Sequence, residues 1–230
     1  MNCESKVVFF DIDGTMLSTG GAGQRAMELA LVEEFQVDFP FDGILTAGRT
    51  DCGIADEIFE RFRLNDTPAE RTRFERSYLD RLSDCLKELP GALLPGVVDL
   101  LEQLHDHQGF ELSLLTGNYA EGAWIKLRHF GIDHFFSHGG FGDLHARRDD
   151  VAGVALQAAS AALGRRLNGS ESIVLGDTPA DIQCARAIKA RAIAVATGVY
   201  DSSELRRHDP DHLFENLGDT GRVLDVLLKG

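Results

Sequence analysis

The sequence contains little that is typical of a membrane, secreted or disulfide-rich protein. Among its 230 residues, the longest stretch without a charged side chain is 151–164, which is too short to span a bilayer. The residues before Asp11 include Glu4 and Lys6 instead of an apolar signal core, so no signal peptide is expected. The four cysteines, Cys3 among them, are widely spaced without a CxxC pair, which argues against a zinc site or a disulfide framework. We therefore expect a soluble cytoplasmic protein with reduced thiols.

Basic residues are scarce relative to acidic ones. The chain has 23 Lys and Arg against 37 Asp and Glu, a formal net charge of −14. This balance disfavours nonspecific binding to nucleic acid or to an anionic membrane surface, so neither is expected as a partner. It does not exclude a small anionic substrate, because a local cation can reverse the field inside a cleft. The composition leaves monomer and homodimer equally open.

The hydrophobic pattern changes its period along the chain. Residues 7–10 are apolar at every position, which is typical of a strand covered on both faces. From 20 to 89 the apolar residues instead recur at helical spacing, and the glycine run at 20–23 lacks the GK[ST] of a phosphate-binding P-loop. After Leu89, helical and strand patterns alternate. We expect strands at 112–115, near 135–136, at 172–175, at 192–196 and near 213–214.

Alternating strands and helices predict an α/β fold with a doubly wound parallel sheet. The helical stretch interrupts this pattern after the first strand. We therefore predict a catalytic core made of 1–17 and 92–230, with an inserted all-helical cap domain at 18–91.

Polar side chains collect where the predicted strands end. Asp11 and Asp13 follow the first strand, Thr116 and Asn118 the second, and Asp177 a later one, with Asp181 one helical turn beyond. Ligands of open parallel sheets bind at this edge. Clustered carboxylates raise one another's pKa unless a cation lies between them, and oxygen ligands suit Mg²⁺. One such aspartate alone could equally be a turn former or helix cap, but their joint placement favours a magnesium site.

These residues resemble three motifs of the haloacid dehalogenase superfamily. The segment 11–15 (DIDGT) is similar to its first motif, 115–118 (LTGN) to its second, and 176–181 (GDTPAD) to its fourth. The resemblance covers nearly the whole chain. The position of the helical insert resembles the cap of the phosphoglycolate phosphatase and β-phosphoglucomutase branch.

The resemblance implies a mechanism for phosphate ester hydrolysis. Asp11 would attack phosphorus and form an aspartyl phosphate. Asp13 would protonate the leaving group and then take a proton from water. Mg²⁺ would be held by Asp11, Asp13 through its backbone carbonyl, and Asp177, with Asp181 as an indirect partner.

The resemblance also implies how the substrate is held. The Thr116 hydroxyl and the amides of Gly117 and Asn118 would bind the phosphate oxygens. Gly14 would leave room for the substrate beside Thr15.

The family also places a cation against the phosphate, commonly a Lys followed by Pro. No such pair is present, and none of the five lysines is a good candidate by sequence position. Arg147 and Arg148 lie between the predicted 135 strand and the next helix, where this motif belongs. We favour Arg148 and keep Arg147 as its rival; the alternative is a solvated arginine pair, which the helix dipole disfavours.

Within the cap, the loop ending in Arg49 and Thr50 is a further candidate for substrate binding. Arg49 could reach a substrate carboxylate or second anionic group, or it could simply pair with Asp51 or Asp42. The predicted function is a Mg²⁺-dependent phosphatase acting on a small phosphorylated metabolite. A phosphomutase of the β-phosphoglucomutase type and a non-catalytic metabolite-binding protein are the alternatives.

Overall fold

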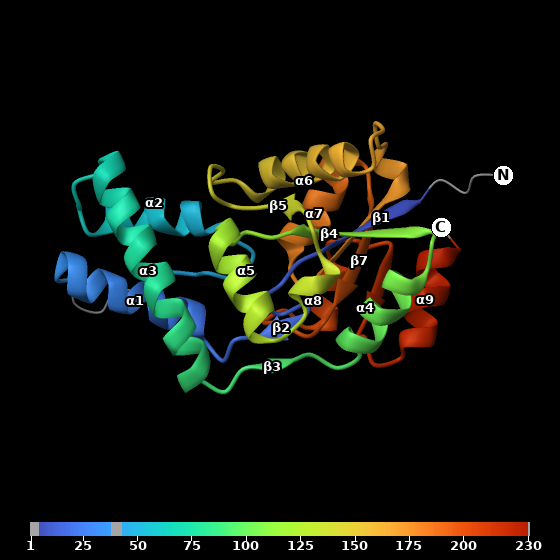
Figure 1. Cartoon of the computed structure of the whole chain (residues 1–230), viewed down its shortest axis with the longest axis horizontal. Coiled ribbons are helices and arrows are strands. Elements are labelled where there is room, and N and C mark those ends of the chain that lie inside the picture. The colour runs from blue at the N-terminus through green and yellow to red at the C-terminus, as the bar shows by residue number, and fades with distance from the viewer. Residues whose placement is uncertain (1–4, 38–42, 230) are drawn as a thin grey trace.

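The computed structural model describes residues 5–37 and 43–229, so Cys3 and Asp42 lie outside the described residues. Its main feature is a sheet of six strands in the order β5-β4-β1-β6-β7-β8, in which every neighbouring pair is parallel (Figure 1). The strands are β1 (Lys6–Phe10), β4 (Phe110–Leu115), β5 (Gly139–Gly140), β6 (Ser172–Gly176), β7 (Arg191–Val195) and β8 (His212–Phe214). This arrangement confirms the predicted parallel α/β sheet.

Both faces of the sheet are covered, as the uninterrupted apolar run of β1 predicts. Val8 and Phe10 belong to one hydrophobic cluster, whereas Val7 and Phe9 belong to another, because successive side chains of a strand point to opposite faces. The first face is covered by α4 (Val97–Asp106), α5 (Ala120–His129) and α9 (Thr220–Leu228). The second is covered by α6 (Arg148–Ala162), α7 (Pro179–Ile188) and α8 (Ser202–Arg206). The sheet is therefore doubly wound.

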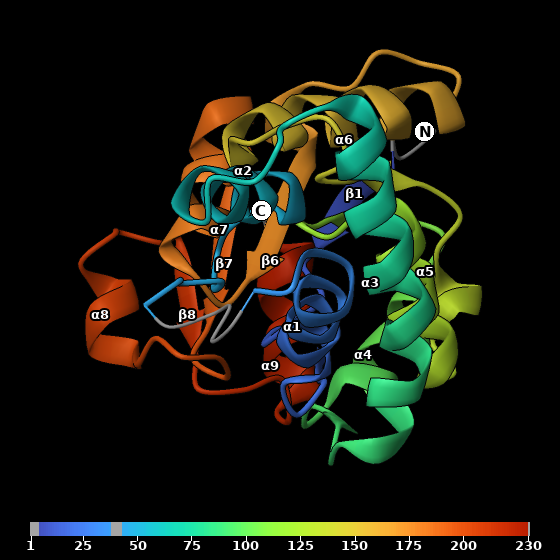
Figure 2. The same ribbon diagram turned by 90° about the vertical axis from the view of Figure 1, so that its left-hand side faces the viewer.

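The helical stretch forms three helices: α1 (Ala22–Phe35), α2 (Asp51–Arg61) and α3 (Pro68–Glu88). They share a separate hydrophobic cluster, which Tyr119 also joins. Local sequence sets their starts, since Thr50 and Thr67 cap α2 and α3 through their side chains and Pro68 occupies the first turn of α3. Figure 1 shows these helices on the left, and Figure 2 shows the same group from that side. The short strands β2 (Leu17–Ser18) and β3 (Ala92–Leu93) pair antiparallel where the predicted insert begins and ends.

One predicted strand is wrong. Residues 133–135 form a 3₁₀ helix, η1 (Asp133–Phe135), and the edge strand lies later, at β5. The reason is that Phe136 packs edge-on against Phe10 under the sheet, with ring centroids 5.9 Å apart. The strand itself needs glycine, because a Cβ at Gly140 would lie 2.7 Å from the Ala155 side chain. A second 3₁₀ helix, η2 (Gly169–Glu171), precedes β6.

Two further features concern the helices and the cysteines. Within the described ranges, no helix combines the length and the apolar character that a membrane span requires. The described cysteines, Cys52, Cys85 and Cys184, are all free thiols.

Candidate active site

The carboxyl ends of the three central strands meet at one place. In the register of the sheet, Phe10 lies beside Leu114 of β4 and Leu175 of β6, so the residues that follow these strands are neighbours. The structure thereby brings together the predicted first, second and fourth motifs. Their side chains border a cavity of about 440 Å³ between this sheet edge and the helices α1–α3, a volume ordinary for a small-molecule site.

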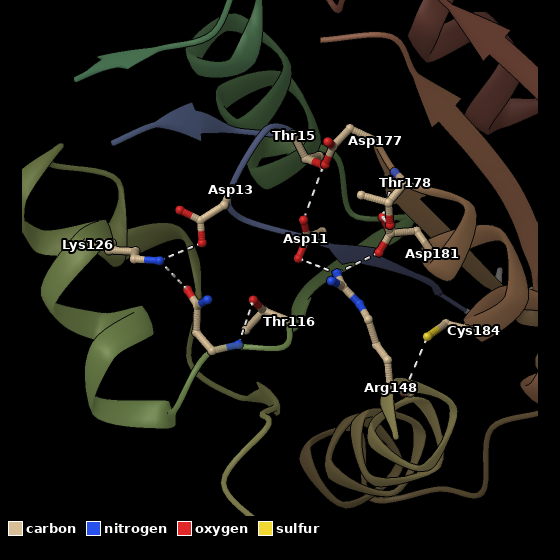
Figure 3. Close-up of polar contacts among 11 residues, drawn as sticks. Asp11, Asp13, Thr15, Thr116, Lys126, Arg148, Asp177, Thr178, Asp181 and Cys184 are labelled. Atoms are coloured by element: carbon tan, nitrogen blue, oxygen red, sulfur yellow. Dashed lines mark hydrogen bonds and ion pairs between the residues drawn. The ribbon is translucent and has the colours of Figure 1, made fainter. Parts of the chain in front are cut away.

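Three buried carboxylates form a compact cluster at the sheet edge (Figure 3). One oxygen from each of Asp11, Asp177 and Asp181 lies within 4.8 Å of the others. The Arg148 guanidinium joins two of them, since its Nη2 lies 2.5 Å from Asp11 Oδ1 and 2.6 Å from Asp181 Oδ1. One arginine against three carboxylates leaves an excess of negative charge in a buried place.

The pKa values reflect this crowding. Burial raises the pKa of Asp11 to about 7, against the lowering effect of Arg148. Burial, followed by the nearby Asp11 carboxylate, raises the pKa of Asp177 well above its usual value. For Arg148, burial would lower the pKa, but Asp11 and Asp181 outweigh it and raise the pKa. A divalent cation beside Asp11 and Asp177 would favour their ionised forms.

The surroundings of Asp177 enclose its carboxylate tightly. A Cβ at Gly14 would lie 2.4 Å from Asp177 Oδ2, and one at Gly198 would lie 1.7 Å from the same atom. The Thr15 hydroxyl donates a hydrogen bond of 2.8 Å to Asp177 Oδ1. Two glycines and a threonine therefore hold this carboxylate in place. Thr15, predicted to contact substrate, supports Asp177 and does not border the cavity.

Asp181 has most of its hydrogen-bonding capacity filled by protein. Its Oδ2 accepts from the Thr178 amide at 2.9 Å and the Thr178 hydroxyl at 2.7 Å, while Oδ1 accepts from Arg148. The bond from the Thr178 amide is also half of the capping box that starts α7. This arrangement favours an indirect role for Asp181. Asp181 nevertheless belongs to the compact carboxylate cluster, whereas the side chain of Asp13 does not.

The Asp13 side chain turns away from the cluster and pairs with a lysine. Lys126 Nζ lies 2.6 Å from Asp13 Oδ2 and 3.0 Å from Asn118 Oδ1 (Figure 3). The Lys126 side chain is 4% exposed, whereas that of Asp13 is 38% exposed and borders the cavity. The expectation about lysines concerned only the cation beside the phosphate, and Lys126 pairs with Asp13 instead of Asp11; its presence at the cavity was not predicted. A signal was present, since a lysine between Ala123 and Leu127 lies on the buried face of its helix.

Of the two adjacent arginines, only Arg148 reaches the site. Arg148 opens α6 and is buried, whereas the Arg147 side chain is 76% exposed and pairs with Asp149 at 3.4 Å. The placement agrees with the preference for Arg148 over Arg147.

The second motif also joins the sheet to the cap loop. The Thr116 hydroxyl accepts a hydrogen bond of 3.3 Å from the Asn118 amide. The Asp51 amide donates 2.7 Å to the Gly117 carbonyl. A Cβ at Gly117 would lie 2.0 Å from the Arg49 carbonyl oxygen, so only glycine allows this approach. Thr116, Gly117 and Asn118 all border the cavity, as their predicted role in phosphate binding requires.

The two predicted cap residues have other contacts. The Arg49 guanidinium pairs with Glu57 and donates to the carbonyls of Leu45 and Gly53 at 3.2 and 2.8 Å, rather than pairing with Asp51. Arg49 still borders the cavity. Thr50 is fully buried and outside the cavity lining, where its hydroxyl accepts from the Gly53 amide and donates to the Ala146 carbonyl, both at 3.0 Å. Thr50 thus caps α2 and ties it to the core.

Comparisons with known proteins agree with this geometry. Residues 8–186 match the family model of the haloacid dehalogenase-like hydrolases. The chain belongs to this family. Among curated relatives, it is 25% identical to pyrophosphatase PpaX of Halalkalibacterium halodurans, covering 97% of both chains. It is 27% identical to phosphoglycolate phosphatase of Synechococcus elongatus, covering 97% of this chain and 99% of the relative.

A solved structure shows the same fold. The chain superposes on CbbY from Rhodobacter sphaeroides, determined in complex with phosphate, with a TM-score of 0.72, 20% identity, and coverage of 94% of this chain and 96% of that one. Both curated relatives named above are phosphatases by name, of different substrates.

Proposed function

We propose that this chain is a Mg²⁺-dependent phosphatase that hydrolyses a small phosphate monoester through an aspartyl phosphate on Asp11. The observation that carries the proposal is the placement of the Asp11 carboxylate. It borders an open cavity, is paired with Arg148, and lies in a compact carboxylate cluster with Asp177. The whole-length likeness to curated phosphatases supports the same reaction class.

The donor set fits a hard divalent cation. Carboxylate oxygens of Asp11 and Asp177 would hold it, together with the Asp13 backbone carbonyl, and Asp181 would support the site through Arg148 and Thr178. When bound, Mg²⁺ would neutralise the carboxylates and draw charge from the phosphoryl oxygens.

The protein's own groups would carry the two halves of the reaction. An Asp11 oxygen would form a bond to phosphorus as the bond to the leaving oxygen breaks, and Asp13 would give that oxygen a proton. In the second half, Asp13 would take a proton from water as the water oxygen attacks phosphorus, which releases phosphate and restores the Asp11 carboxylate. Arg148, the Thr116 hydroxyl and the amides of Gly117 and Asn118 would stabilise the phosphoryl oxygens.

The test is phosphate release from a panel of phosphorylated metabolites, with Mg²⁺, with EDTA, and with Mg²⁺ restored. We expect release with Mg²⁺, loss with EDTA, and recovery on adding the ion back. Equal rates with and without chelator would contradict the proposed site.

The same panel separates the alternatives. Release of phosphate from several esters without a bisphosphate activator would exclude a phosphomutase. Binding of esters without turnover would favour a non-catalytic protein. The cytoplasmic location and the choice between monomer and homodimer stay predictions.

A further inference from the structure

Residues 117–119 lie between β4 and α5 and include the two amides that the proposed reaction uses to bind phosphoryl oxygens. We call them the phosphate segment. Gly117 and Asn118 of this segment border the cavity. Backbone amides stabilise a phosphoryl group only when the surrounding structure fixes their direction beforehand. The contacts that fix this backbone therefore bear on the reaction.

A residue from outside the parallel sheet contacts both peptide units of the phosphate segment. Asp51 is the first residue of α2. Its amide donates a hydrogen bond of 2.7 Å to the Gly117 carbonyl, and its Oδ2 accepts one of 2.8 Å from the Tyr119 amide. Asp51 thus bonds to the segment on both sides of Asn118, which restricts the rotation of the backbone between the two contacts.

The geometry of the peptide unit converts these contacts into a direction for the amides. The C=O and N–H of a trans peptide point in opposite directions. Because the Gly117 carbonyl is directed at Asp51, the Asn118 N–H of the same peptide unit is directed away from it, towards the Thr116 hydroxyl at 3.3 Å. Thr116 also borders the cavity, so this is the side on which the proposed reaction needs the amide.

The second peptide unit is held from two sides. The Gly142 amide donates 2.8 Å to the Asn118 carbonyl, and the Asp51 carboxylate accepts from the Tyr119 N–H at the other side of the same unit. One contact comes from the loop that follows β5 and the other from α2. The carboxylate of Asp51 therefore completes a support that the core supplies only in part.

The Asp51 carboxylate is expensive for the fold. It is 5% exposed and has no ion pair among the described residues, and burial raises its pKa to about 6, with Lys126 acting against this effect. A neutral acceptor would cost less in such surroundings. What the charge adds is a stronger hydrogen bond from the Tyr119 amide than a neutral acceptor would receive. A costly group at this position is better explained by the reaction than by stability.

The loop before α2 and the start of α2 lie directly against the core. A Cβ at Gly117 would lie 2.0 Å from the Arg49 carbonyl oxygen, and one at Gly53 would lie 2.7 Å from the Ala146 carbonyl oxygen. Two backbone approaches this close fix the place of α2 relative to the phosphate segment. The contacts of Asp51 therefore exist only while α2 occupies this place.

Resting on the proposed phosphatase function, we propose that Asp51 is a positioning residue, which holds the phosphate segment in the shape that binds the phosphoryl group and so couples the placement of α2 against the core to phosphate binding. In this role Asp51 acts through the backbone of residues 117–119 and makes no contact with the leaving group. Its effect is then the same for every phosphate ester, because the phosphoryl group is common to all of them.

The first test is the affinity for inorganic phosphate, measured by calorimetry with Mg²⁺ present. Asp51→Ala removes the acceptor for the Tyr119 amide and should weaken binding by about tenfold. Asp51→Asn keeps an acceptor oxygen and should bind within about threefold of the wild type. If Asp51→Ala does not fold, Asp51→Ser takes its place, since the serine side chain is too short for the same contact. Equal affinities in the wild type and Asp51→Ala, or no phosphate binding by the wild type, would overturn the proposal.

The second test compares two leaving groups. Asp51→Ala should lower kcat/KM by about 10–100-fold, and by the same factor for p-nitrophenyl phosphate and for glycerol phosphate. Factors that differ by more than about fivefold between the two esters would show that Asp51 contacts the leaving group, and would contradict a role through the phosphate segment.

The matched control weakens another of the inserted helices without touching the phosphate segment. Thr67 caps α3 by accepting a hydrogen bond of 3.3 Å from the Glu70 amide. Thr67→Ala should lower the unfolding temperature but leave phosphate affinity unchanged. Equal weakening of phosphate binding in Thr67→Ala and Asp51→Ala would show a general loosening of these helices and contradict the assignment to Asp51.

The two measurements fail separately for the two proposals. If no ester is hydrolysed but phosphate binds and Asp51→Ala weakens its binding, the phosphatase function is wrong and the positioning role stands. If esters are hydrolysed and Asp51→Ala equals the wild type in both measurements, the phosphatase function stands and the positioning role is wrong.

Discussion

The two ends of the cavity differ in how their polar groups are satisfied. At the sheet edge, Asp11, Asp181 and Arg148 satisfy one another, and glycines close around Asp177. At the cap end, the Tyr78 hydroxyl has no partner and Asp51 has no ion pair among the described residues. The network of the sheet edge, complete apart from a cation, is suited to the proposed reaction, whereas Asp51 and Tyr78 take no part in that chemistry.

The largest expected effect contrasts one carboxylate at each end. Asp11→Asn should lower kcat by at least about 10³-fold, because an amide is not a nucleophile for phosphorus. Asp51→Asn should change kcat/KM much less, because Asp51 takes no part in the proposed chemistry. Phosphate release and circular dichroism on both variants measure this contrast; comparable losses for both would remove the distinction between the two ends.

The next largest effect concerns the arginine of the sheet edge. Arg148→Met should reduce kcat by roughly 10²-fold and destabilise the fold by about 3–5 kcal/mol, because Asp11 and Asp181 lose their shared partner. Arg148→Lys should restore part of the activity and part of the stability, since a single nitrogen of Arg148 contacts both Asp11 and Asp181. Thermal unfolding and steady-state kinetics measure the series, with exposed Arg147→Met as the control. Loss of activity in Arg147→Met instead would reverse the assignment.

Lys126 holds the proposed acid and base Asp13, so its removal should have an intermediate effect. Lys126→Met leaves Asp13 and Asn118 without their cation, and we expect kcat to fall by about tenfold, because the Asp13 carboxylate is no longer held beside the leaving group. Lys87→Met, which changes an exposed lysine on α3, is the matched control. An unchanged kcat in Lys126→Met would show that the ion pair only stabilises the fold.

The smallest expected effect is on stability and depends on pH. The folded-state pKa of Asp51, about 6, is above its ordinary value of 3.8, so its destabilising contribution is absent below pH 4 and complete above about pH 6. Asp51→Asn should therefore match the wild type near pH 4 and be more stable by roughly 1–3 kcal/mol at pH 8. Urea unfolding at the two pH values measures this difference. Reduced stability of Asp51→Asn at pH 8 would contradict the raised pKa.

The residues of the sheet edge could be predicted from the sequence better than the residues of α2, α3 and α5 that border the cavity. The sheet edge was predictable because its residues lie directly after buried apolar strands, and parallel strands bring their carboxyl ends together. The β5 strand was missed because a glycine pair has no hydrophobic signal, whereas the aromatic pair Phe135–Phe136 does. Arg148 was favoured over Arg147 on its nearness to the helix start, which the placement of both side chains supports.

The cap end was not predictable in the same way. Asp51, Tyr78 and Lys126 come from three different helices, and only the packing of the cap helices against α5 brings them to one cavity. The side-chain contacts of Arg49 were equally hidden, because its partner Glu57 lies 8 residues further on, inside α2, while the sequence pointed to nearer aspartates. Tertiary packing decides such contacts, so residue type and spacing alone do not.

The central claim is that Asp11 accepts the phosphoryl group. In Asp13→Asn the intermediate should persist, because the carboxylate proposed to activate water is missing. A quenched reaction with acetyl phosphate and Mg²⁺ should therefore accumulate phosphoenzyme. Peptide mass spectrometry after acid quench is expected to find one added phosphoryl group on Asp11, and none in the Asp11→Asn, Asp13→Asn double variant. A phosphoryl group on another residue, or turnover without any phosphoenzyme, would contradict the account.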